Sequence, residues 1–201
     1  LYIVLEPAVT KGAFTVSQSV TTEISFLTPA HNIVLTPSID VSVGGQASGQ
    51  TQVVVKTNDH LGYLMTIAAS SSLGMMGIAS STKYIPAYVT GTSGVPDYSF
   101  TVPANSAYFG YTVEASTTSD LAQNFRDSAG VCNAVSGGDT AGKCWMSATT
   151  TAYTIINRAS ATSLSGATTT LKFLVVINSN PNPGIPNDTY VATTTLTATA
   201  N

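Results

Sequence analysis

The chain has 201 residues, enough for one large domain, with 43% apolar residues, 8% charged residues and a formal net charge of −3. An ordinary soluble domain is about 25% charged, and here 31 Thr and 23 Ser replace the missing charge. The apolar content excludes a disordered chain, and the lack of a basic cluster excludes a nucleic-acid-binding protein, which needs Lys and Arg at phosphates.

The first five residues are apolar on both faces of an extended chain: Leu1, Tyr2, Ile3, Val4 and Leu5. A strand of this kind must be covered on both sides. Pro7 ends it, because proline cannot donate to a strand ladder, and Lys11-Gly12 supplies a hinge. The pattern predicts a donor strand over residues 1–12, which completes the sheet of another copy by β-addition, ahead of one domain over residues 13–201. The alternative is that it completes the sheet of its own chain.

The chain also carries signs of export. It starts at Leu1 rather than at Met, which predicts that a preceding segment such as a secretory signal is removed. No run approaches the ~18 consecutive apolar residues of a membrane span, so we expect no integral membrane segment. Together these features predict an extracellular or cell-surface protein.

Residues 14–26 alternate strictly between two faces. One face holds Phe14, Val16, Gln18, Val20, Thr22, Ile24 and Phe26, and the other holds mainly Ser and Thr. Such alternation is typical of a half-buried strand. We therefore expect one long strand, or two collinear strands with a bend near Thr21-Thr22. Its five apolar side chains should be buried, and Thr15, Ser17, Ser19 and Thr21 should face solvent or a neighbouring subunit.

The rest of the chain also has the pattern of strands separated by Pro, Gly, Asn and Asp clusters. Strands are expected at residues 32–36, 52–57, 63–68, 99–102, 108–115, 152–157, 169–178 and 189–199, and a single short helix is expected at 119–126. The sequence therefore predicts an all-β protein: a single Greek-key or jelly-roll-like β-sandwich of about nine strands.

Two cysteines, Cys132 and Cys144, flank a glycine-rich loop. An even, minimal cysteine count in a chain with signs of export indicates one disulfide in an oxidising compartment. Closing a loop of about a dozen residues removes roughly 3 kcal/mol of freedom from the unfolded chain. The alternative is a pair of reduced structural cysteines. Trp145 either packs beside this loop or offers a platform for a sugar ring.

Catalytic signals are weak. The glycine-rich segment 137–143 imitates a phosphate-binding loop, but Cys144 stands where Ser or Thr is required and no helix pattern follows. His31 and His60 lie in turn-like segments, and no G-x-S-x-G nucleophile motif occurs. We therefore expect no enzyme, no catalytic residue, no cofactor and no metal site.

Two modification or ligand sites stay open at this point. Asp120, Asp127 and Asp139 cluster around the cysteine loop and carry the oxygen ligands that calcium prefers, although the D-x-D-x-D spacing is missing. Asn187 begins an Asn-Asp-Thr sequon for glycosylation at a loop-to-strand boundary.

Four strand and turn segments carry a resemblance to a group of known proteins: residues 14–26, residues 55–63, Cys144-Trp145 and residues 186–197. They resemble predicted secreted surface proteins of candidate-phyla bacteria, over nearly the whole chain after residue 12. This resemblance implies export and a surface location, and no activity. A β-sandwich with an apolar N-terminal strand is also similar in architecture to donor-strand filament subunits such as the TasA-like fibre proteins.

Two functions fit these features. The first is a structural subunit of an extracellular filament, a homo-oligomer held by exchange of the N-terminal strand. The second is a monomeric or wall-attached binding module with Trp145, Tyr108 and Tyr111 as platforms for a glycan. The first function predicts that residues 1–5 are buried in a neighbour, and the second predicts an aromatic patch that faces solvent.

Overall fold

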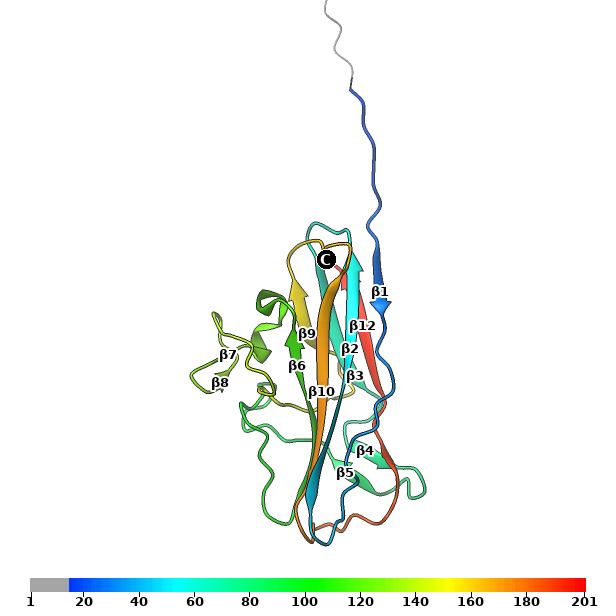
Figure 1. The fold of residues 1–201 in the computed structure, drawn as a ribbon, viewed down its shortest axis with the longest axis vertical. Coiled ribbons are helices and arrows are strands. Elements are labelled where there is room, and N and C mark those ends of the chain that lie inside the picture. The colour runs from blue at the N-terminus through cyan, green and yellow to red at the C-terminus, as the bar shows by residue number, and fades with distance from the viewer. Residues whose placement is uncertain (1–14) are drawn as a thin grey trace, which may run out of the picture.

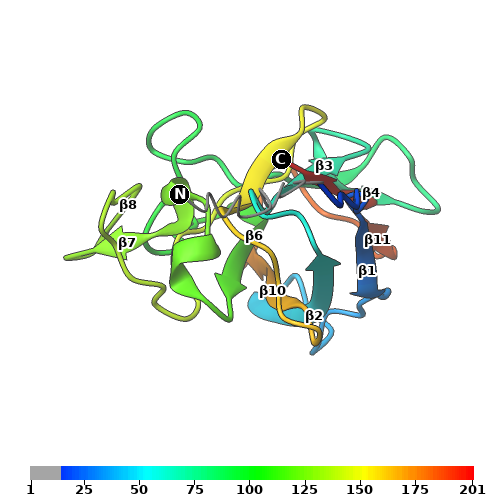
Figure 2. The same ribbon diagram turned by 90° about the horizontal axis from the view of Figure 1, so that it is seen from above.

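A computed structural model describes residues 15–201, and these residues form an all-β protein. One antiparallel sheet has the order β1 (Ile24–Thr28), β2 (Gly45–Thr57), β10 (Ala167–Ile177), β6 (Ala107–Ala115). A second antiparallel sheet has the order β12 (Thr194–Ala200), β3 (Tyr63–Ala69), β9 (Tyr153–Arg158). The two sheets face each other (Figure 2), so the expected β-rich sandwich is confirmed.

Shorter strands complete the fold. Three of them form a small sheet, β11 (Tyr190–Val191), β4 (Gly74–Gly77) and β5 (Tyr84–Pro86), and two form a hairpin, β7 (Asp127–Ser128) and β8 (Val131–Cys132). The described residues thus hold twelve strands where about nine were expected, because four of these pieces have only two or three residues. The Greek-key connectivity stays a prediction.

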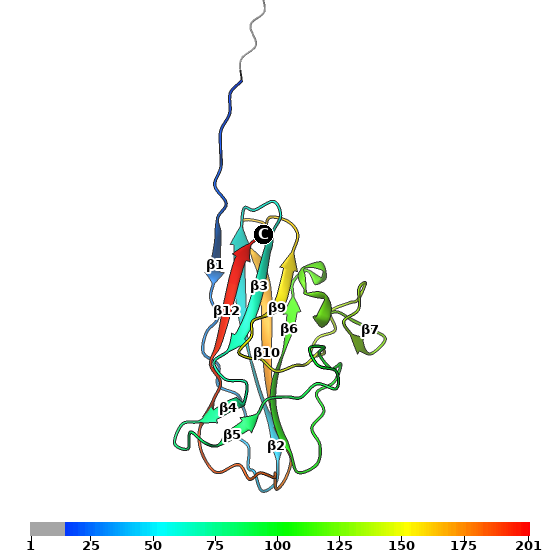
Figure 3. The ribbon, with the colours of Figure 1, turned by 180° about the vertical axis from the view of Figure 1, so that it is seen from behind.

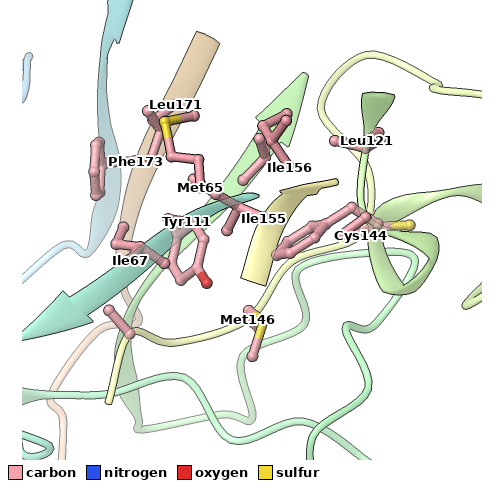
Figure 4. Packing of buried hydrophobic residues seen from close by; sticks show 14 of the residues in the cluster. Met65, Ile67, Tyr111, Leu121, Cys144, Met146, Ile155, Ile156, Leu171 and Phe173 are labelled. Atoms are coloured by element: carbon pink, nitrogen blue, oxygen red, sulfur yellow. The ribbon is translucent and has the colours of Figure 1, made fainter. Parts of the chain in front are cut away.

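Alternation along β10 explains its central place. From Ala167 to Ile177 every second side chain is buried in the core, and those between are half-buried. Figure 4 shows Leu171 and Phe173 of this strand converging with Met65, Ile67 and Tyr111 from the neighbouring and opposite strands. Burial of each large apolar side chain contributes roughly 1.5–3 kcal/mol, so this interior is the main source of stability.

Four of the predicted strands are confirmed to within two residues as β3, β6, β9 and β10, and 52–57 forms the second half of the longer β2. Two predictions are wrong: residues 32–36 contribute a single bridge, from Thr36 to Ser48, and residues 99–102 form no strand. The predicted helix at 119–126 is also wrong. It is two 3-10 turns, η1 (Thr118–Asp120) and η2 (Gln123–Phe125), because the backbone between them pairs with β9.

The predicted long strand over residues 14–26 is also largely wrong. Its described part pairs only from Ile24 onward, and Ile24 and Phe26 are half-buried. Val16 and Val20, expected in the core, are 84% and 82% exposed, and Phe14 lies outside the described residues. The reason is that β2, the partner strand, ends at Thr57 opposite Ile24, so no ladder is available further up the chain.

Candidate functional site: a projecting arm and an open sandwich edge

Residues 15–23 form an extended segment, here called the arm, that precedes β1. It runs beyond the end of the sandwich near the C-terminus and lies against no other strand in Figures 1 and 3. Every residue of the arm is exposed, including Val16 and Val20. The alternating sequence predicts that one face of this segment is buried, but both faces are exposed.

The root of the arm is fixed by the turn that follows β2. The Asn58 side chain donates from Nδ2 to the Thr21 carbonyl at 3.0 Å and accepts from the Glu23 amide at Oδ1, at 2.7 Å. The Thr57 hydroxyl donates to the Glu23 carbonyl at 2.7 Å. These three bonds hold residues 21–23 in line with β1, so the six residues before them point away from the sandwich.

On one side of the sandwich the two edge strands, β1 and β12, lie next to each other (Figures 1 and 3), and no ladder joins them. On β12 the inward side chains are Thr194, Leu196, Ala198 and Ala200, and all four are only half-buried. Inward residues of the central β10 are fully buried. The interior is therefore incompletely covered along β12.

A groove of about 660 Å³ opens at this edge. One wall is formed by residues 26–35, the other by residues 190–196, and Leu171 and Phe173 lie at its floor. None of the described residues that line it is Asp, Glu, Lys or Arg. An uncharged, largely apolar groove beside the unpaired edge of a strand can bind an extended segment through backbone hydrogen bonds and apolar side chains.

Both histidines have structural positions. His31 lies in the groove wall, where its Nδ1 is 3.0 Å from the Thr51 hydroxyl, and its amide donates to the same oxygen at 3.1 Å. The His60 side chain is exposed in the turn between β2 and β3, with the Asp59 carboxylate 3.7 Å away. The His31–Thr51 contact links the groove wall to β2, and the His60–Asp59 contact lies at the surface.

The opposite edge of the sandwich is closed. The predicted disulfide between Cys132 and Cys144 is confirmed, with a Cα–Cα distance of 5.7 Å. Directly after it, Met146 exchanges two backbone hydrogen bonds with Tyr111 of β6, at 2.8 and 3.0 Å. On the other sheet the Ala122 amide donates to the Ile155 carbonyl of β9 at 3.0 Å. The disulfide lobe and the 3-10 turns therefore pair with both edge strands on this side.

The aromatic side chains proposed as a glycan platform do not form an exposed patch. Trp145 is 8% exposed, donates from Nε1 to the Gly142 carbonyl at 2.8 Å and packs edge-to-face on Phe100. Tyr111 is 1% exposed, and half-buried Tyr108 packs edge-to-face on Tyr88. The aromatic reading of the binding module is therefore wrong, because these rings fill the closed edge.

The three carboxylates considered for calcium each have a protein partner. Asp120 pairs with Arg158 at 2.5 Å, Asp127 accepts from the amide and hydroxyl of Thr140, and Asp139 accepts from the Ala115 amide. Burial, together with the nearby Glu114 carboxylate, raises the pKa of Asp139. No group of three or more His, Cys, Asp or Glu residues able to hold a metal ion occurs within residues 15–201.

The sequon residue Asn187 is exposed in the loop before β11. Its neighbour Asp188 accepts from the amides of Ala79, Ser80 and Thr189, and these bonds lower the pKa of the Asp188 carboxyl. The loop is thus fixed, and the Asn187 side chain is accessible beside the groove wall.

Sequence reasoning missed the groove, since its walls come from segments about 160 residues apart. The predicted donor residues Leu1, Tyr2, Ile3, Val4 and Leu5 lie outside the described residues, as does the hinge at Lys11-Gly12. Within the described range, no helix is long and apolar enough to cross a membrane. Comparison of the chain with known protein families, with curated proteins and with solved structures finds no match.

Proposed function

We propose that the chain is a structural subunit of an extracellular filament or pilus-like surface assembly and that it polymerises by exchange of its N-terminal strand. One observation carries the proposal: an extended arm, uncharged over residues 15–22, leaves the sandwich at one end, while the sandwich keeps an apolar groove open beside an unpaired strand edge. An apolar groove and a free edge are aggregation hazards in a monomer, and assembly removes both.

The donated segment has its most apolar part at residues 1–5. Burial of Leu1, Ile3 and Leu5 in another copy contributes roughly 1.5–3 kcal/mol each, about 5–9 kcal/mol in all before costs. Ordering the segment and joining two subunits costs a comparable few kcal/mol of free energy, which offsets part of this gain. Further contacts between subunits then supply part of the net affinity, and surfaces rich in Ser and Thr and poor in charge repel little when stacked.

The location follows from the same features. A disulfide persists in oxidising compartments, which supports an exported protein. The resemblance to secreted surface proteins implies the same location. We propose a structural rather than an enzymatic role.

The test is assembly with and without the N-terminal residues. The full chain should form filaments visible by negative-stain electron microscopy, and a chain lacking residues 1–9 should keep its circular dichroism spectrum and melting curve but form none. As a matched control, Val131→Asp with Val135→Asp adds acids at two exposed valines on the closed side and should polymerise normally. A full chain that remains monomeric at high concentration would overturn the proposal.

A further inference from the structure

We infer that the groove beside β12 receives the arm of a second copy. Residues 15–20 run in the direction opposite to β12, with Val16 at the start of β12 and Val20 nearer the end of the sandwich, and both side chains turn toward the interior. This inference rests on the proposed function and deepens it. It identifies the acceptor surface, the direction of the donated strand and a second apolar part of it, in addition to residues 1–5.

The apolar residues of the arm lie on the same face of the extended chain as the inward-facing residues of β1. Val16 and Val20 are an even number of residues from Ile24 and Phe26, whose side chains turn toward the interior. In an extended chain all four therefore lie on one face. Only the two in β1 find cover within the chain, while Val16 and Val20 are more than 80% exposed. A face with this pattern is suited to burial, and the burial has to come from another chain.

The acceptor edge has the matching properties. Strand β12 pairs with β3 on one side, and its other edge has no strand partner within residues 15–201. Its inward side chains Thr194 and Leu196 line the groove and are half-buried. An added strand would bond to the free edge and cover these side chains with its own alternate residues. Residues 15–20 and the groove are both uncharged, so no charge is buried on contact.

The arm and the groove of one chain lie toward opposite ends of β12. The arm root is held by Asn58, in the turn before Tyr63, and Tyr63 pairs with Ala200 at the end of β12. The groove is lined by Thr194, Thr195 and Leu196 at the beginning of the same strand. Because the arm points away from the groove, it cannot reach the groove of its own chain without breaking both Asn58 side-chain bonds. A second copy stacked end to end presents its arm to the groove directly.

The strand directions also determine how the arm runs relative to β12 and how far it extends into the next copy. Strand β1 is antiparallel to β2, β2 leads through one turn into β3, and β3 is antiparallel to β12, so β1 and β12 run in opposite directions (Figure 3). An arm that continues β1 in a copy of the same orientation is therefore antiparallel to β12. Six extended residues span about 20 Å. Thr51, which lines the groove together with Thr194 and Leu196, lies six residues, or about 20 Å, inside the start of β2, so the tip of the arm at residues 15 and 16 reaches the start of β12 in an end-to-end copy. The contact is head-to-tail and does not close, which gives a filament.

The arm face is tested by a matched pair of double variants in the full chain. Val16→Asp with Val20→Asp should raise the critical concentration for filament formation about 100-fold or more, since two buried valines become two buried carboxylates. Ser17→Asp with Ser19→Asp, on the opposite face of the same strand, should change it less than fivefold. These residues are exposed in the single chain, so folding is unaffected.

The groove is tested by complementation. Thr194→Arg with Leu196→Arg fills it, and Thr197→Arg with Thr199→Arg, on the exposed face of β12 and outside the groove lining, is the control. The groove-filled chain keeps a competent arm, and the Val16→Asp, Val20→Asp chain keeps a competent groove. Neither should polymerise alone, whereas an equimolar mixture should give a 1:1 complex that stops at two subunits in analytical ultracentrifugation. A groove-filled chain that fails to fold would also give no complex, so its circular dichroism spectrum is first compared with that of the wild-type chain. If the double variant does not fold, Thr194→Arg alone serves as the milder variant.

Direction is tested in this mixture with single cysteines and a short bis-maleimide. The groove-competent chain carries Thr195→Cys, near the start of β12, and the partner carries Ser19→Cys or Thr15→Cys. Position 15, at the tip of the arm, lies deeper in the neighbouring copy than position 19 and closer to position 195, so Thr15→Cys should cross-link at least fivefold more. Preference for Ser19→Cys overturns the direction. Filaments formed normally by the Val16, Val20 variant or by the groove-filled variant overturn the inference while leaving strand exchange itself intact. Wild-type chains that form no filaments overturn the proposed function.

Discussion

The two edges of the sandwich are completed in different ways. At the edge formed by β6 and β9 the chain returns twice, with residues 144–146 against β6 and residues 121–122 against β9, and the disulfide closes the lobe between them. At the edge formed by β1 and β12 the chain returns with residues 29–36, which leave a groove and make a single bridge to β2, from Thr36 to Ser48. One edge is therefore covered within the chain, and the other has its inward side chains half exposed.

The irregular segments of the chain are unevenly distributed between the two edges. Almost all of the non-strand segments with buried aromatic and apolar side chains, such as Trp145, Met146, Leu121 and Phe125, lie at the closed edge. The open edge has β12, which is composed of Thr, Ala and one Leu. An uncovered edge of this composition fits a site that another chain completes, and the predictions below measure the difference.

The largest expected effect compares the same truncation of a large aliphatic side chain near each edge. Ile155 in β9 is fully buried, whereas Leu196 in β12 is half-buried. We expect Ile155→Ala to lower the free energy of unfolding by about 4 kcal/mol and Leu196→Ala by about 1 kcal/mol, because a buried truncation leaves a cavity. Urea denaturation of the monomer at low concentration measures both. Equal losses would show that the two edges are equally covered.

Removal of the disulfide should lower the free energy of unfolding but leave filament formation unchanged. Cys132→Ser with Cys144→Ser is expected to lower the free energy of unfolding by about 3 kcal/mol, since the bond closes a loop of 12 residues. Filaments formed below the melting temperature should persist, because the disulfide lies at the edge remote from the groove. Thermal melts and electron microscopy of the same sample separate the two outcomes. Loss of filaments from a folded variant would place the closed edge in the assembly contact.

Two ion pairs sharpen the comparison further. Arg158 in β9 pairs with Asp120 of η1, and both side chains are largely buried; Lys172 in β10 pairs with Glu114 of β6 and is more exposed. We expect Arg158→Ala to destabilise by about 2 kcal/mol, because it leaves a buried carboxylate unpaired. Lys172→Ala should cost about 0.5 kcal/mol in a more solvated pair. Denaturant midpoints of the two variants measure the difference, and a larger loss at Lys172 would contradict it.

The smallest effect appears only at alkaline pH. Burial, together with the nearby Asp120 carboxylate, raises the pKa of Tyr63 from its ordinary value near 10 to about 12. The fold favours the neutral phenol, so this contribution to stability is complete below pH 10 and is lost as the pH rises through 12. Tyr63→Phe should remove this part of the pH dependence between pH 9 and 12. Unfolding free energies at each pH provide the readout, and an unchanged slope in Tyr63→Phe would refute the assignment.

Strand patterns with a partner in the chain were read correctly from the sequence. Tyr63–Ala69 and Ala107–Ala115 alternate, have a neighbour on each side and form strands as expected. Residues 15–23 alternate equally well but form no strand, because local alternation reports suitability for burial and carries no information on whether a partner is present. The predicted helix failed for a related reason: Leu121 and Ala122 pair with β9, a long-range contact that overrides helical spacing.

The sequence alone determined the class of this protein: low charge, abundant Thr and Ser and period-two patterning require an all-β fold, and two cysteines flanking a glycine-rich loop indicate the disulfide. These are local properties, set by backbone preference and solvent affinity at each position. Only the tertiary structure decided which edge is covered, that Trp145 is buried, and that residues 26–35 and 190–196 enclose a groove. Those outcomes depend on which distant strands pair, and that choice is made by the summed packing of the whole core rather than by any single segment.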